Sequence, residues 1–204
     1  MSFEGEVPKL KPVSMNADPD CAAKHSEPVM SEMLVLGTGQ TLGNVYLSVK
    51  GGLPDGSWPV PSEPVVLDQK GCRYDPHVLG VMVGQPFKLL NSDGLLHNVH
   101  ALPKVNKQFN MAMPASRTEA VETFNSVEDI FTIKCDVHPW MNAFVAVSAH
   151  PFFDVTGTDG EFRIGDLPAG TYEIEAWHER LGTRTASVTL GEGASETLDF
   201  AFSR

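Results

Sequence analysis

The sequence predicts an all-β protein that contains two β-sandwiches, and three observations support this prediction. The chain has 18 Gly and 15 Pro among its 204 residues, above the average combined share of about 12%, so turns are frequent. Between these turns, short runs alternate apolar and polar residues, as strands with one buried face do. No long segment places apolar residues at the spacing of a helix face. The 42% apolar and 20% charged residues are ordinary globular values and exclude a coiled coil, a collagen or a disordered chain.

Residues 1–63 form an N-terminal segment with few strand signals. One short helix is expected near Asp18–Lys24, and one strand at Asn44–Lys50, where every second residue is apolar. The run Gly51–Pro64 is rich in Pro and Gly and indicates a linker. Because the strand Asn44–Lys50 has no partner within this segment, we expect the segment to complete the second sandwich.

Residues 64–149 form a denser middle block, whose strand spacing is typical of a sandwich or small barrel. The expected strands are Val65–Asp68, Gly80–Val83, Pro86–Leu90, Leu96–Leu102, Ala120–Phe124, Ile130–Cys135 and Phe144–Val147. This block is predicted to be the first sandwich.

Residues 150–204 contain a second run of strand signals around a hairpin turn at Asp159-Gly160. The expected strands are Phe152–Thr156, Glu161–Ile164, Thr171–Glu179, Thr185–Leu190 and Thr197–Phe202. These strands are few for a sandwich, so we expect the two ends of the chain to complete each other, with the middle block inserted between them.

Charge and motif content exclude several functions. The chain has 15 basic and 26 acidic residues, a net charge of −11, which argues against nucleic acid or an anionic membrane as a partner. No stretch approaches the roughly 18 apolar residues of a membrane span. Nucleophile-elbow, zinc-protease, phosphate-loop and dinucleotide motifs are all missing. We therefore expect a protein that is not an enzyme.

The informative motif is a C-x₂-H-x₂-M run formed by Cys135, His138 and Met141. Alternation along the preceding strand places the Cys135 thiol on the core side at the end of that strand. Upstream, His97 and His100 are three residues apart in a predicted strand, so they point to opposite faces. His97 shares its strand face with Val99, which is the face expected to point into the core beside Cys135. His97 is therefore the expected ligand.

Two imidazoles, one thiolate and one thioether are the ligand set of a trigonal blue-copper site with a weak axial methionine. Sulfur ligands suit Cu(I) and imidazoles suit Cu(II), so a mixed set favours electron transfer. We expect one copper ion bound by His97, Cys135, His138 and Met141. His100 is expected to be a surface or hydrogen-bonding residue, and Asn98 to hydrogen-bond to the ligand loop.

These motifs resemble those of the cupredoxins, and most closely the amicyanin-like subgroup. The resemblance lies in Asn91, in His97–His100 (HNVH), in Cys135–Met141 (CDVHPWM), and in the opening segment Val65–Pro76 with its later turn Val83–Gln85. It implies a cupredoxin Greek-key β-sandwich with one type 1 copper ion. It also implies a carrier of single electrons between redox protein partners of the cytochrome or dehydrogenase class.

The resemblance also implies where the protein works and how it docks. Type 1 copper proteins are loaded outside the cytosol, which implies a periplasmic or extracellular location and a signal peptide that was removed. Residues 64–149 carry a net charge of only −1, with seven Lys or Arg against eight Asp or Glu. We therefore expect a partner to dock through apolar contacts around Leu95, His138, Pro139 and Trp140. The oligomeric state is not predicted.

The C-terminal third resembles the carboxypeptidase regulatory-like, or transthyretin-like, β-sandwich. The resemblance lies in the turn Asp159–Phe162 (DGEF) and in Leu167–Tyr172 (LPAGTY). The first strand of that family is similar to Leu42–Val49, which agrees with a sandwich formed by both ends of the chain. Two further functions stay open: a protein that stores, senses or delivers copper, and a docking module of a larger redox or surface assembly.

Cys21 and Cys72 leave three alternatives open, of which the simplest is that both stay free thiols. An exported protein would favour a disulfide between them. Alternatively, Cys21, His25, Cys72 and His77 could form a second metal site. Cupredoxins usually have an apolar residue where Cys72 stands, so the resemblance does not decide among the three.

Overall fold

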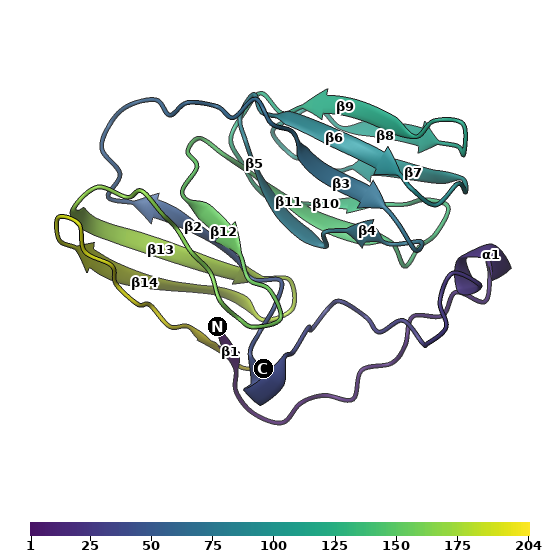
Figure 1. The fold of residues 1–204 in the computed structure, drawn as a ribbon, viewed down its shortest axis with the longest axis horizontal. Coiled ribbons are helices and arrows are strands. Elements are labelled where there is room, and N and C mark those ends of the chain that lie inside the picture. The colour runs from purple at the N-terminus through teal and green to yellow at the C-terminus, as the bar shows by residue number, and fades with distance from the viewer. The chain divides into compact units, whose positions relative to one another are not determined.

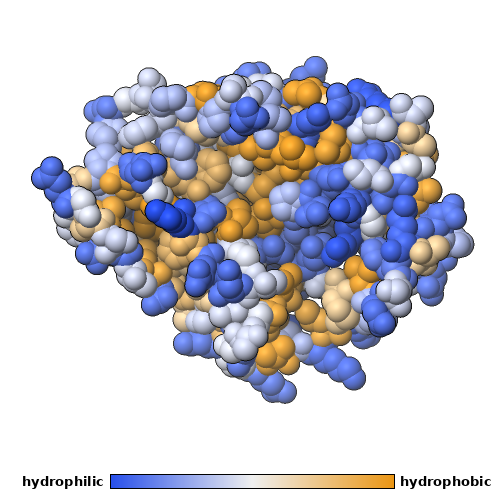
Figure 2. All heavy atoms as spheres, in the orientation of Figure 1, coloured by the Kyte–Doolittle hydropathy of each residue, from blue (hydrophilic) through white to orange (hydrophobic).

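The computed structural model describes all residues 1–204 and confirms the all-β prediction (Figure 1). Its strands form four sheets, and its only α-helix, α1 (Pro19–Ala22), lies within the predicted helical stretch. No helix is long and apolar enough to cross a bilayer. On the face seen in Figure 2, hydrophilic and apolar side chains are intermixed.

The chain folds into two compact units. The larger unit comprises Leu10–Met30 and Trp58–Pro151, and the smaller unit comprises Met1–Lys9, Ser31–Ser57 and Phe152–Arg204. The predicted division into 1–63, 64–149 and 150–204 stays a prediction, and it differs from these units mainly at Leu10–Met30, which belongs to the larger unit. A disulfide between Cys21 and Cys72 ties this stretch to the rest of the larger unit.

The larger unit has two sheets. One has the order β4-β3-β6-β9 and the other the order β5-β11-β10-β7-β8. The strands are β3 (Val65–Gln69), β4 (Tyr74–Asp75), β5 (Val78–Met82), β6 (Pro86–Asn91), β7 (His97–Ala101), β8 (Phe109–Met113), β9 (Glu119–Thr123), β10 (Glu128–Lys134) and β11 (Asn142–Ser148). β3 pairs with β6 and β5 pairs with β11 in parallel, so the connections are not a simple series of hairpins.

Apolar alternation explains how the two sheets form one core. In β6, Phe87 and Leu89 are fully buried while the residues between them are partly exposed, and β10 repeats this pattern with Phe131 and Ile133. Their side chains belong to one cluster of buried residues. The sequence did not predict β4, which has only two residues, or β8, whose register places Met113 opposite His97.

The smaller unit has a four-stranded sheet in the order β12-β2-β13-β14. Its strands are β2 (Tyr46–Gly51), β12 (Phe153–Val155), β13 (Gly170–His178) and β14 (Gly182–Leu190), and a short parallel pair joins β1 (Ser2–Phe3) to β15 (Ala201–Phe202). β2 lies between β12 and β13, so strands from both ends of the chain form one sheet.

Two strands expected in this unit differ from the structure. Glu161–Ile164 forms no strand, because Gly160 and Asp166 on either side have positive φ and the Arg163 N–H donates to the Asp154 carboxylate. The strand expected at Thr197–Phe202 is reduced to β15. Alternation alone did not reveal these turns.

Candidate metal centre

The predicted ligands come from one strand and one tight loop. His97 is the first residue of β7, and the loop between β10 and β11 carries Cys135, His138 and Met141. Two backbone hydrogen bonds close this loop: Cys135 N–H donates to Met141 O at 3.1 Å, and Met141 N–H donates to His138 O at 3.0 Å. Met141 is buried where the loop enters β11.

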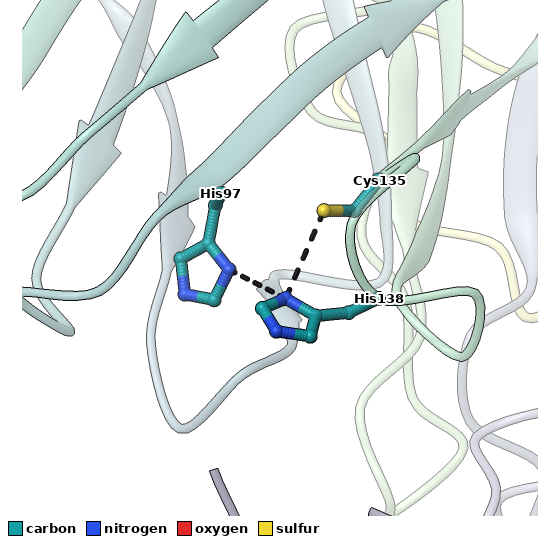
Figure 3. Close-up of side chains that lie close together, drawn as sticks. All are labelled: His97, Cys135 and His138. Carbon is teal, nitrogen blue, oxygen red and sulfur yellow. Dashed lines mark hydrogen bonds between the residues drawn. The ribbon is translucent and has the colours of Figure 1, made fainter. Parts of the chain in front are cut away.

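Three donor atoms converge inside the larger unit (Figure 3). The Nδ1 atoms of His97 and His138 are 2.9 Å apart, and Cys135 Sγ is 3.9 Å from His138 Nδ1. Both separations are shorter than the roughly 4 Å sum of two ordinary metal–ligand bonds, so one ion can contact these donors. All three side chains are at most 2% exposed, which excludes bulk water.

Carboxylates hold the opposite edges of both imidazole rings. His97 Nε2–H donates to Asp93 Oδ2 at 2.9 Å, and His138 Nε2–H donates to Asp18 Oδ2 at 3.0 Å. An ionised carboxylate only accepts hydrogen bonds, so each ring carries a proton on Nε2. Both Nδ1 lone pairs then face each other, and only a cation or a proton between them makes this arrangement favourable. Carboxylate–imidazole pairs of this kind orient histidine ligands in metal sites.

The pKa values of His97, Cys135 and Asp93 are all shifted, in the directions that keep a proton at the site when no metal is bound. Burial opposes the charged form of His97, but the Asp93 hydrogen bond and the nearby Cys135 raise its pKa to about 9. Burial likewise opposes the thiolate of Cys135, yet its hydrogen bonds to His97 and Asn98 lower its pKa overall. For Asp93, hydrogen bonds from His97, Cys72 and Gly71 outweigh burial and bring the pKa to about 2. The donors are therefore electrostatically coupled.

Asn98 braces the ligand loop, as the sequence predicted. Its Oδ1 accepts the Asp136 N–H at 2.6 Å and lies 3.3 Å from Cys135 Sγ, while its Nδ2 donates to Asn110 Oδ1 at 2.7 Å. His100 points away from the centre, and its Nδ1 lies 2.9 Å from Asp136 Oδ2. The expectation that His100 is a hydrogen-bonding residue is confirmed.

Sequence reasoning missed both carboxylates. Asp93 stands four residues before His97, in the turn between β6 and β7, and could have been found from this spacing. Asp18 is 120 residues from His138 in the chain, and no local pattern connects the two. The disulfide alternative for Cys21 and Cys72 is confirmed, so these thiols do not form the alternative metal site with His25 and His77.

The expected docking face needs a correction at His138. A partner was expected to dock around His138, but this ring is only 2% exposed, because Asp18 and Cys21 lie against its outer edge. Trp140 is also partly buried, lies tilted against the His138 ring with 5.0 Å between the ring centroids, and donates its Nε1–H to Cys72 O. The sequence could not show that an N-terminal stretch covers this loop.

A family model described as the carboxypeptidase regulatory-like domain matches residues 138–203, less than half of the chain, and it begins inside the ligand loop rather than at the predicted boundary of 150. No curated protein matches the chain.

Similar solved structures include cupredoxins and a copper enzyme. A Cu(I) structure of an amicyanin mutant is 22% identical, with 50% of this chain and 98% of that chain covered and a TM-score of 0.38. A purple cupredoxin from Nitrosopumilus maritimus is 22% identical, with coverages of 41% and 98% and a TM-score of 0.34. The Cu-containing nitrite reductase from Thermus scotoductus SA-01 is 18% identical, covers 48% of this chain, and has a TM-score of 0.39. This chain spans only 25% of that enzyme.

Proposed function

We propose that the larger unit binds one type 1 copper ion and carries single electrons between redox proteins by Cu(I)/Cu(II) cycling. The observation that supports this most is the convergence of the Nδ1 atoms of His97 and His138 with the Cys135 sulfur, while each Nε2 is held by a carboxylate. Two imidazoles and a thiolate, with Met141 as a weak fourth ligand, are the donor set of a blue-copper centre.

The chain's own residues favour electron transfer over substrate chemistry. Bound copper would supply a one-electron couple. The loop hydrogen bonds, the two carboxylates and Asn98 fix the donors without help from the metal, so they have little freedom to move when the charge changes. Because the donors are almost fully buried, the centre has no open face for a substrate, and we propose a carrier rather than an enzyme.

The disulfide supports a location outside the cytosol. Disulfides persist in oxidising compartments and are rare in the cytosol, and Cys21 and Cys72 form one here. We propose a periplasmic or extracellular protein that exchanges electrons with a partner of the cytochrome or dehydrogenase class.

Visible absorption and EPR spectra of the copper-loaded, oxidised protein test this function. We expect an intense thiolate-to-copper band in the wild type and its loss in Cys135→Ser, because the band needs the sulfur ligand. His100→Ala is the matched control, since it removes a neighbouring imidazole outside the ligand set, and it should keep the band. A band that survives in Cys135→Ser would contradict the proposed site.

Two further measurements separate this function from its rivals. Rapid, reversible one-electron voltammetry is expected of a carrier. Copper that exchanges with a chelator within minutes would instead favour a copper-handling protein. A chain that does not retain copper would favour a docking module.

A further inference from the structure

An N-terminal stretch of the larger unit lies over the outer edge of the candidate centre. This stretch, Leu10–Met30, is called the strap below. Its two ends meet in a bridge between Pro12 and Met30, and its middle is fixed by the Cys21–Cys72 disulfide. Met15 from the strap is buried in the core cluster of the larger unit. The strap is therefore part of the folded unit and not a loose terminus.

Within the strap, Asp18 makes two kinds of contact. Its Oδ1 accepts the N–H groups of Asp20 and Cys21 at 3.0 and 3.1 Å, which caps the short helix α1. Its Oδ2 accepts the Nε2–H of His138 at 3.0 Å. One oxygen thus has a local structural role, while the other reaches the ring of a proposed metal ligand.

The surroundings of Asp18 do not form a second metal site. Asp18, Cys21 and His138 lie within 4.8 Å of one another by their donor atoms, and so do Cys72, Asp93 and His97. Both groups include a cysteine whose sulfur is bonded in the disulfide, so neither offers a thiolate. Both carboxylates already accept hydrogen bonds from imidazole and backbone N–H groups.

We propose that Asp18 is a positioning residue of this metal centre: it keeps the proton of His138 on Nε2, so that Nδ1 is the nitrogen that faces the metal. This inference rests on the proposed function and deepens it. His138 belongs to a loop of only a few residues, where a ring can turn about its side-chain bonds. The Asp18 carboxylate fixes both the tautomer and the ring orientation, as carboxylates beside histidine ligands do.

Three variants separate this role from helix capping. Asp18→Ser and Asp18→Asn both keep a good N-cap residue, so a purely structural role predicts that neither affects the metal centre. Serine is too short to reach His138 and removes the brace. Asparagine that caps through its oxygen turns its NH₂ toward His138 Nε2, which favours a proton on Nδ1 and blocks metal binding there. Asp20→Asn is the matched control, because it removes an exposed charge two residues away.

The first readout needs no metal. Nitrogen-15 NMR of the metal-free protein reports which ring nitrogen of His138 carries the proton. We expect Nε2–H in the wild type and in Asp20→Asn, a mixture in Asp18→Ser, and mainly Nδ1–H in Asp18→Asn. An unchanged His138 tautomer in all variants would overturn the proposal. Because this readout uses metal-free protein, it can be interpreted even if the wild type fails to show a blue-copper spectrum. Failure of the positioning role can therefore be distinguished from failure of the proposed function.

The second readout is the binding of copper. Loss of a carboxylate brace commonly weakens metal binding by about 10- to 100-fold. We expect Cu(II) affinity to fall about tenfold in Asp18→Ser and up to about 100-fold in Asp18→Asn. If Cu(I) binding is unchanged, the potential rises by about 59 mV per tenfold loss for a one-electron couple. Equal potentials and affinities in Asp18→Ser, Asp18→Asn and the wild type would overturn the proposal.

Discussion

Replacing Asp93 with Asn should destabilise the larger unit by at least about 3 kcal/mol, because its carboxylate accepts three hydrogen bonds that an amide cannot all accept. Asp93 Oδ1 accepts the Gly71 N–H at 2.7 Å, and Oδ2 accepts the Cys72 N–H at 2.7 Å and the His97 Nε2–H at 2.9 Å. An amide has one oxygen, so at least one buried donor loses its partner at a cost of about 1–3 kcal/mol, and the remaining bonds lose their charge assistance at about 1 kcal/mol each. For a chain of this size, this corresponds to a melting temperature lower by roughly 10 °C.

Denaturant unfolding measures this loss, with Asp75→Asn as the control because Asp75 is an exposed carboxylate of the same unit. The midpoint should fall in Asp93→Asn while the slope stays the same, and the control should match the wild type. A loss below about 1 kcal/mol would refute the hydrogen-bond accounting, since even one unpaired buried donor costs that much.

The pH dependence of this loss has a defined sign. The folded pKa of His97 is raised to about 9, so its contribution is fully present below its unfolded value of about 6.5 and disappears as pH rises through 9. The folded pKa of Asp93 is lowered to about 2, so its contribution is present above its unfolded value of about 3.9 and disappears as pH falls through 2. The difference between wild type and Asp93→Asn should therefore be largest between about pH 4 and pH 6.5.

Two further predictions concern protons and the disulfide. Because the pKa of His97 is about 9 in the metal-free protein, copper binding at pH 7 should release about one proton from this ring, and the apparent affinity should fall up to about tenfold per pH unit below 9. Calorimetry in buffers with different ionisation enthalpies counts that proton, and an affinity independent of pH would contradict the pKa of His97. The variant Cys21→Ala/Cys72→Ala should lose about 4 kcal/mol of unfolding free energy by loop entropy, given a sequence separation of 51 residues, and equal stability would contradict it.

The sequence could single out the residues that converge at the candidate centre, because their information is local. The spacing of Cys135, His138 and Met141 is set within one loop, and alternation along β10 fixes the side on which the thiol lies. His97 could be separated from His100 because neighbouring odd and even positions of a strand face opposite sides. These inferences need only the period of a strand.

The parts that sequence reasoning missed depend on contacts between distant segments. Nothing near Asp18 indicates that it meets His138, since the two residues are 120 positions apart and meet only in the folded unit. The burial of His138 within the expected docking face was missed for the same reason. β8 was missed although Phe109, Met111 and Met113 occupy every second position of it, and its pairing with β7 places Met113 opposite His97.

The disulfide links the stability of the larger unit to the geometry of the centre. Cys21 lies three residues after Asp18, and the Cys72 N–H donates to the Asp93 carboxylate. The disulfide therefore connects the segment that contains Asp18 to the residue that holds Asp93 by a hydrogen bond. Cys21→Ala/Cys72→Ala should therefore weaken copper binding as well as stability. The core variant Phe87→Ala is the matched control, because it should cost a similar amount, about 3–5 kcal/mol, at a fully buried position in β6. Under conditions where both variants stay folded, the control should keep the copper affinity of the wild type. Equal affinities in all three proteins would show that the disulfide serves stability alone and that the carboxylates hold their rings without it.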